Sequence, residues 1–377
     1  MSRLLLFLLL ASVVSAPRAT SPLGEPLYRV QGAFDDVAVK RDLAFFAVRE
    51  AESGEPDVRI YRLGRGGRAK LVGDYFNADG AYGLEVAGNY LYLANGDRGL
   101  EIIDISDPTH PREVALQPLK GFSHQVRLQR GHAFVASGFG GMHVVDVRRP
   151  RQPRLVATWQ AYPSPMDAPP VAPVAEGLFP QGGEEPAASS GGYPDSYYDA
   201  DDLPAYEGVE EEVPMSEIAR KEGALDLTLG DGVAYLAYAS AGIVILDISN
   251  PKTPVPLVTL PYDHPVDRVQ VSGNDLYATA GIAGVQRLDV GTPSAPVTVA
   301  AYRTLCYPQG VAPVGERVYV ADGYCGSDGL LTLDLRPGAG EPRTGSVAGT
   351  VGNVRSAGGR LFVMGLDEAR VFALPGQ

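Results

Sequence analysis

The chain has 377 residues, 45% of them hydrophobic, and a formal net charge of −13 at pH 7. The apolar content is enough for a large core, and 45 Gly and 31 Pro residues suit a chain with many turns without reaching collagen-like or disordered composition. The net negative charge repels phosphate backbones, so we expect no nucleic-acid partner.

The N-terminus has the layout of a secretory signal peptide. A basic Met-Ser-Arg start precedes an apolar run at residues 4–14, and small residues follow at Ser15, Ala16 and Ala19. This run is too short to span a bilayer. We therefore predict a signal peptide over residues 1–19, cleaved between Ser15 and Ala19, with an uncleaved anchor as the alternative. Because no later segment is apolar enough to cross a membrane, the mature chain is expected to be secreted, periplasmic or on the cell surface.

A strand phrase then recurs along most of the chain. Its clearest copy, residues 89–108, reads NYLYLANGDRGLEIIDISDP. The steps between the ends of successive third strands are 42, 42, 101, 42, 45 and 39 residues. These ends fall at Arg62, Asp104, Asp146, Asp247, Asp289, Asp334 and Ala373. The step of 101 residues corresponds to one repeat plus an insertion of 59 residues.

Each repeat reads as four short strands separated by tight turns. Runs rich in β-branched and aromatic residues alternate with Gly, Asp and Pro, and no long stretch has helical periodicity. Four-stranded units spaced by 40–45 residues are typical of propeller blades. The sequence therefore predicts an all-β fold, a seven-bladed β-propeller of four-stranded blades over residues 25–377, with the aromatic residues of the second strands in the core.

The two ends of the chain predict how the ring closes. The last copy stops after its third strand, at Leu374, whereas residues 25–34 resemble the fourth strand of other copies, such as residues 153–159. One blade would then be built from both ends of the chain, with the N-terminal strand closing the ring and removing an exposed edge.

The third strands carry a family resemblance. Residues 100–104 (LEIID) and 243–247 (IVILD) nearly match the phrase that names the LVIVD-repeat family, and residues 142–146 (MHVVD) and 330–334 (LLTLD) match it more loosely. The chain resembles this family over nearly its whole length except the signal and the insertion. The resemblance implies a β-propeller on bacterial or archaeal surface and exported proteins, and it implies no defined reaction.

The insertion, residues 163–222, differs from the repeats in composition. It is Pro- and Ala-rich at first, and residues 176–222 hold 13 acidic and two basic residues, a net charge of −11. Such a composition is typical of a flexible acidic segment. It joins the fourth strand of one blade to the first strand of the next, which places it on the same face as the channel mouth. It could cap that face, bind cations or dock a basic partner, or it could be a solvated loop.

The repeated aspartates are interpreted as structural. A residue that occupies one position in five blades lies around a ring and not at one site, and an Asp before a turn can accept local backbone N–H bonds. They are Asp104, Asp146, Asp247, Asp289 and Asp334.

Cys306 and Cys325 are the only cysteines. Export favours a disulfide between them, and the two loops that hold them emerge on the same face of a propeller. No His lies close in the sequence to support a metal site or a nucleophile.

The start of each first strand lines the mouth of the central channel, and the residues there differ between blades. They are Asp35, Asp36, Tyr82, His124, Gln125, Asp226, Asp267, Arg268, Gln309 and Asn353. The candidate binding residues among them are Asp36, His124, Asp226, Asp267 and Gln309. Convergent carboxylates and amides could hold a cation such as Ca²⁺, or a sugar. The alternative is that they bond to backbone groups and channel water.

Two functions fit these observations. The first is a non-catalytic scaffold, expected to be a monomer, that binds an extracellular or envelope protein or glycan. The second is a metal-dependent hydrolase or lyase at the channel mouth, using Asp36, His124, Asp226 and Asp267. Linear motifs for zinc proteases, α/β-hydrolases and phosphate-binding loops are absent from the sequence, so the first function is preferred.

Overall fold

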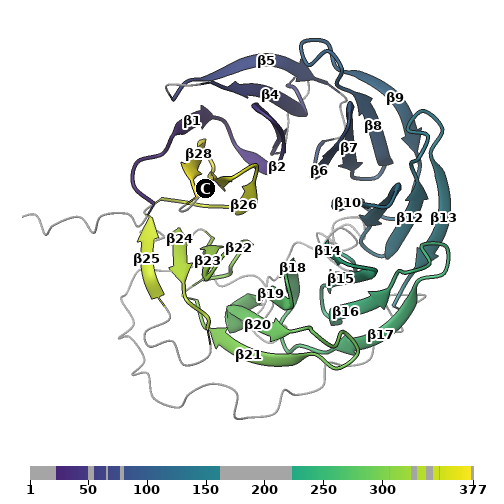
Figure 1. Ribbon diagram of the computed structural model, residues 1–377, viewed down its shortest axis with the longest axis vertical. Helices are drawn as coiled ribbons and strands as arrows, with labels where there is room; N and C mark the ends of the chain where they lie inside the picture. Colours follow the sequence, from purple (N-terminus) through teal and green to yellow (C-terminus); the bar gives the residue numbers. More distant parts are fainter. Residues whose placement is uncertain are drawn as a thin grey trace, which may run out of the picture.

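The computed structural model describes residues 23–49, 55–64, 67–76, 80–161, 223–304, 306–323, 329–336, 343–347 and 349–374. Across these residues the regular elements are β-strands and one short 3-10 helix, η2 (Gly281–Ala283). The strands form seven four-stranded antiparallel sheets, which stand in a ring as the blades of a propeller (Figure 1). The predicted all-β, seven-bladed architecture is confirmed.

The first four blades follow one another along the chain. Blade 1 comprises β2 (Phe34–Lys40), β3 (Leu43–Val48), β4 (Val58–Leu63) and β5 (Ala69–Tyr75). Blade 2 comprises β6 (Gly83–Ala87), β7 (Tyr90–Asn95), β8 (Gly99–Asp104) and β9 (Arg112–Gln117). Blade 3 comprises β10 (Gln125–Gln129), β11 (His132–Ala136), β12 (Met142–Asp146) and β13 (Arg154–Trp159). Blade 4 comprises β14 (Asp226–Gly230), β15 (Val233–Tyr238), β16 (Gly242–Asp247) and β17 (Val255–Leu260).

The remaining blades complete the ring. Blade 5 comprises β18 (Val266–Ser272), β19 (Asp275–Ala280), β20 (Val285–Asp289) and β21 (Val297–Tyr302). Blade 6 comprises β22 (Gly310–Val314), β23 (Arg317–Ala321), β24 (Leu330–Leu333) and β25 (Arg343–Val347). Blade 7 comprises β26 (Asn353–Ala357), β27 (Arg360–Met364), β28 (Glu368–Ala373) and, as its outermost strand, β1 (Tyr28–Gln31).

Blade 7 is the point of closure. Strand β1 pairs antiparallel with β28, with Tyr28 opposite Val371 and Gln31 opposite Glu368. Figure 1 shows the purple N-terminal strand beside the yellow C-terminal one. The prediction that the N-terminal strand closes the ring is therefore confirmed.

The core lies within and between the blades. Each second strand carries an aromatic residue that faces a residue of the third strand across the ladder. In six blades the facing residue is β-branched and fully buried. The pairs are Phe45–Ile60, Tyr92–Ile102, Phe134–Val144, Tyr235–Ile245, Tyr319–Thr332 and Phe362–Val371. Blade 5 departs from this pattern, because Tyr277 faces Arg287 there.

The repeated aspartates are turn residues, as predicted. In each case Oδ1 accepts the backbone N–H two residues further on, at 2.8–3.1 Å, so that the side chain fixes the turn after the third strand. The acceptors are Asp104, Asp146, Asp247, Asp289 and Asp334, and the donors are Ser106, Arg148, Ser249, Gly291 and Arg336.

Three predicted features lie wholly or partly outside the described residues. They are the signal peptide, the acidic insertion at residues 163–222 and Cys325. Cys306 is described and buried, and its carbonyl accepts the Thr304 hydroxyl at 2.6 Å. The pairing of the cysteines stays a prediction. Within the described ranges, no helix has the length and hydropathy needed to cross a bilayer.

Candidate functional site at the channel mouth

The innermost strands of several blades carry a polar side chain at one shared position of the ladder, at or near the start of the strand. Asp36, Gln125 and Asp226 lie opposite an alanine of the second strand, and Asn353 lies opposite Met364. In each, a side-chain oxygen accepts the N–H of the next residue at 2.8–2.9 Å. The innermost strand has no neighbour on its channel side, so these side chains satisfy N–H groups that the sheet leaves unpaired.

The same side chains also tie each blade to the next one. Asp36 accepts the N–H of Leu84 in blade 2 at 2.9 Å. Asp226 accepts the N–H of Val269 in blade 5 at 3.1 Å. Asn353 donates its amide to the carbonyl of Asp35 in blade 1 at 2.6 Å.

Glycines make room for two further contacts of this kind. A Cβ built at Gly83 would lie 2.4 Å from the Gln125 side-chain oxygen. A Cβ built at Gly310 would lie 2.4 Å from that of Asn353. Polar side chains and glycines thus lie together at the joints between blades, which favours the structural interpretation of the mouth.

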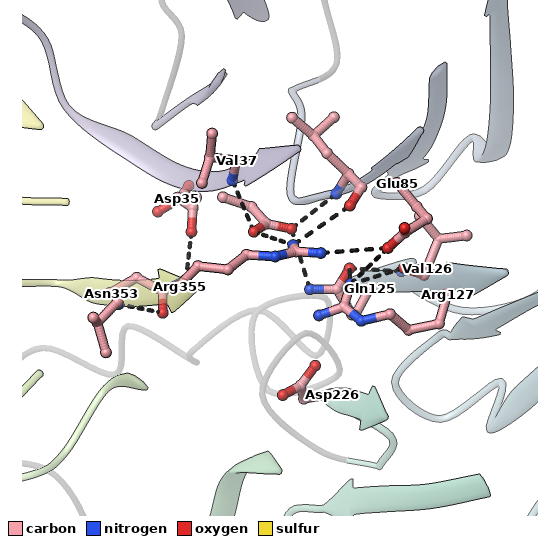
Figure 2. Close-up of polar contacts among 12 residues, drawn as sticks. Asp35, Val37, Glu85, Gln125, Val126, Arg127, Asp226, Asn353 and Arg355 are labelled. Atoms are coloured by element: carbon pink, nitrogen blue, oxygen red, sulfur yellow. Dashed lines mark hydrogen bonds and ion pairs between the residues drawn. The ribbon is translucent and has the colours of Figure 1, made fainter. Parts of the chain in front are cut away.

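Arg355 and the residues around it link four blades near the mouth (Figure 2). From β26 its guanidinium reaches Oδ1 of Asp36 in blade 1 and Oε2 of Glu85 in blade 2, the latter at 3.3 Å. Gln125 of blade 3 donates to Oδ2 of Asp36 at 3.3 Å. Arg127 of blade 3 donates to the Gln125 side-chain oxygen at 2.6 Å and lies 3.9 Å from Glu85.

The acceptor capacity of Asp36 is filled. An ionised carboxylate has about four acceptor positions, and Asp36 receives Val37 N–H, Leu84 N–H, Gln125 and Arg355. Burial would raise the pKa of Asp36, but the two guanidiniums of Arg355 and Arg127 outweigh burial and lower this pKa. The carboxylate is therefore held ionised by its own chain, with no acceptor position left over for a ligand.

The other half of the mouth, in blades 4 and 5, has fewer contacts. Asp226 is buried, and burial raises its pKa despite Arg268 and Arg127. Asp267 is half-buried, and burial raises its pKa to about 6 against the opposing charge of Arg268. No hydrogen bond within the described ranges reaches the Asp267 carboxylate. The Arg268 guanidinium makes one long bond there, 3.4 Å to the carbonyl of Asp267.

Two carboxylates lie at bulges of innermost strands. In β2 the register shifts between Phe34 and Asp36, which leaves Asp35 without a ladder partner. In β18 it shifts between Val266 and Arg268, which leaves Asp267 without one. A bulged residue is turned out of the regular pleat, and bulges commonly re-aim side chains at functional sites.

Asp35 carries its own counter-ion. Arg49 lies 2.6 Å from Asp35, and burial nevertheless raises the pKa of Asp35 above its usual value. The positive charge of Arg268 also acts on the Asp35 carboxylate.

The other two predicted residues have different surroundings. His124 packs against Phe122 with ring centroids 4.9 Å apart, and Phe122 in turn packs edge-on against Tyr82 at 4.6 Å. Gln309 is half-buried, and its backbone N–H donates to Ala321 at 2.7 Å. Across the described ranges no group of three or more His, Cys, Asp or Glu residues is placed to hold a metal ion.

Sequence reasoning did not identify Glu85, Arg127 and Arg355. Each follows its blade's mouth position by two residues, so a signal existed: charged side chains at one position of the innermost strand. The other blades have Ala38, Thr228, Gln270 and Ala312 there. The sequence could not show that Asp36 and Arg355, which are 319 positions apart, form a contact where the ring closes.

Comparison with known proteins supports the repeat and the fold. The LVIVD-repeat family model matches residues 80–116 and 223–258, which confirms the resemblance. No curated protein matches the chain.

Solved structures match the chain over nearly its whole length. A chain in the mitotic checkpoint complex is 12% identical with a TM-score of 0.64, and the match covers 99% of each chain. The β-propeller domain of Cps50 (Swd1) from Myceliophteria thermophila is 12% identical with a TM-score of 0.60, covering 91% of this chain and 98% of that one. The computationally designed Ika8 protein is 10% identical with a TM-score of 0.58, covering 93% and 100%. At such identities the likeness shows the fold alone.

Proposed function

We propose that this chain with LVIVD repeats is a non-catalytic binding scaffold, exported by its signal peptide and acting as a monomer in the periplasm, in the medium or at the cell surface. Its partner is an envelope protein or glycan that docks on the channel-mouth face. The observation that supports the proposal is Asp267, which lies at a bulge of an innermost strand and whose carboxylate accepts no hydrogen bond within the described residues.

The distribution of contacts supports this assignment. Asp36 is fully occupied by donors of its own chain, whereas Asp267 and Arg268 of blade 5 keep most of their hydrogen-bonding capacity. A partner that supplies donors to Asp267 and acceptors to Arg268 would bind there without breaking a contact between blades. The acidic insertion, which precedes Asp226 in sequence, would favour a basic partner over an acidic one.

The test is a quantitative pull-down from envelope extracts with the full mature chain. Asp267→Asn removes one mouth carboxylate, and Asp231→Asn is the matched control, because Asp231 is exposed at the other end of the channel and pairs with Arg130 at 2.5 Å. We expect a partner that wild type and the Asp231→Asn variant retain equally and that the Asp267→Asn variant retains about tenfold less. Identical recovery by all three proteins would overturn the assignment of the mouth.

Deleting residues 163–222 tests the contribution of the insertion separately. If the deletion leaves every partner unchanged, the insertion has no part in docking. The hydrolase or lyase alternative predicts that Ca²⁺ raises and EDTA lowers the melting temperature of the purified protein. A melting temperature that changes neither with Ca²⁺ nor with EDTA would count strongly against that alternative.

A further inference from the structure

Arg287 breaks the repeat in the core of blade 5. At this position of the third strand the other six blades carry Ile, Val or Thr, all fully buried opposite the aromatic residue of the second strand. A charged side chain is costly where the architecture normally buries a methyl group. Its presence in one blade alone marks this position as a candidate for a role other than packing.

The Arg287 side chain is held rigidly. Its Nε and Nη2 donate to the two carboxylate oxygens of Asp275 at 2.9 and 3.0 Å, and Nη1 donates to the Leu335 carbonyl at 3.0 Å. The Arg287 and Asp275 side chains are 17% and 27% exposed. These bonds use three of the five N–H groups of the guanidinium, so two donors remain in a fixed orientation.

These groups line a cavity of about 150 Å³ between blades 5 and 6. Blade 5 contributes Asp275, Tyr277 and Arg287, and the facing wall of blade 6 includes Glu316 and Arg336. Asp275 follows the turn at the far end of the innermost strand, so the cavity lies at the end of the propeller opposite the channel mouth. Its volume corresponds to about five water molecules, which suits one small ligand.

The lining is polar and balanced in charge. Two carboxylates, Asp275 and Glu316, face two guanidiniums, Arg287 and Arg336, and Arg336 lies 2.8 Å from Glu316. An anion or a cation would be attracted by half of this lining and repelled by the other half. A hydroxyl group both donates and accepts, so a neutral polyol can bond to the carboxylates and the guanidiniums together.

We propose that this cavity, the blade 5–6 cavity, binds a single neutral sugar. The free N–H groups of Arg287 donate to sugar hydroxyls, and the carboxylates of Asp275 and Glu316 accept from them. Within the described residues the Tyr277 hydroxyl, which also lines the cavity, has no partner and supplies one more polar contact. The inference does not depend on docking at the channel mouth, because the two sites lie at opposite ends of the propeller.

The test uses free monosaccharides and saturation-transfer difference NMR on the full mature chain. The probes are neutral hexoses, pentoses and N-acetylhexosamines, with acetate and inorganic phosphate as charged comparisons. We expect at least one neutral sugar to bind with a Kd of about 1 mM, the range set by a few hydrogen bonds, and neither anion to bind. If no neutral sugar binds, or if only the anions do, the proposal is overturned.

The decisive variant is Arg287→Ile/Asp275→Val, because Ile245 and Val233 occupy these positions in blade 4 and the fold accepts them there. We expect this variant to bind the sugar at least about tenfold more weakly while its melting temperature stays within a few degrees of wild type. Arg29→Ile/Glu368→Val is the matched control, since it removes an ion pair of 2.6 Å between strands of blade 7, together with the longer contact of 3.8 Å between Glu368 and Arg370. Sugar binding that survives in the first variant, or is lost equally in the control, would refute the site.

Discussion

The innermost strands of blades 7, 1, 2 and 3 carry the same kinds of side chain as those of blades 4 and 5, but the two regions use them differently. In the first region Asp36, Glu85 and Arg355 form a network with distances of 3.3 Å or less (Figure 2). In the second region the Arg268 guanidinium makes one bond, of 3.4 Å, and the Asp267 carboxylate accepts none within the described residues. The same repeat position can thus stabilise the ring in one place and leave polar groups available in another, depending on which charges the neighbouring blades supply.

The strongest test of this comparison is Asp36→Ala. The substitution removes the side-chain acceptor of the Leu84 N–H and the nearest acceptor of the Arg355 guanidinium, and Asp36 is buried. Breaking a buried ion pair by removing one partner costs about 3–5 kcal/mol. We expect a loss of this size in urea unfolding. A loss below about 1 kcal/mol would show that the network does not hold the blades together.

The second test uses Glu101, a buried carboxylate of blade 2. It accepts the Tyr75 hydroxyl and the Asn95 amide, the latter at 2.6 Å, and burial raises its pKa to about 7. The charges of Glu113, which raises this pKa, and of Arg98, which lowers it, also act on Glu101. The pKa of Glu101 is thus higher in the folded protein than in the unfolded chain. The resulting contribution to the free energy of unfolding is fully present below about pH 4.5, and about 3 kcal/mol of it is lost as the pH rises through 7.

The Glu101→Gln variant should flatten this dependence in unfolding free energies measured between pH 4 and pH 8. For Asp36 we expect the opposite dependence of stability on pH. Because its pKa is lowered in the folded protein, its contribution to stability is present above the ordinary pKa of an aspartate and is lost in acid. A wild-type profile in which stability rises from pH 5 to pH 8 would contradict the role assigned to Glu101.

A smaller effect is expected from Asp267→Asn. The raised pKa of about 6 means that ionised Asp267 destabilises the fold at neutral pH. Because the side chain is half-buried and solvent screens it, we expect the variant to be more stable than wild type by about 1–2 kcal/mol at pH 7, and equal to it near pH 4. Thermal unfolding at the two pH values measures this difference. Destabilisation at pH 7 would place Asp267 among the structural carboxylates with Asp36.

Thr228→Val probes the weakest of these contacts. Its hydroxyl oxygen accepts the Gln270 amide and the Val271 N–H of blade 5, both at 3.4 Å. Such long bonds are weak, and valine keeps the shape of threonine, so we expect a loss of about 0.5–1 kcal/mol. A loss as large as that of Asp36→Ala would remove the distinction between the two regions.

The fold could be predicted because its signals repeat. The Asp at the end of the third strand, the aromatic residue of the second and the spare strand before Asp35 each identify a position in the blade, and the structure confirms all three. The site could be predicted only by position. Asp36 and Asp226 lie at the mouth as expected, but whether a carboxylate is saturated depends on residues such as Arg355 that distant blades contribute. Arg287 can be read from the sequence, but only the register of the ladder shows that it lies opposite Tyr277, where other blades have a β-branched residue.

The pairing of β1 with β28 joins residues about 340 positions apart. Strand β1 is synthesised first and can pair only after β28 has been synthesised. The seventh sheet therefore cannot be completed until nearly the whole chain is available. Contacts of such long sequence separation slow folding. Until that contact forms, β28 keeps an unpaired edge, so closure of the ring is expected to be the last step by which the propeller is completed.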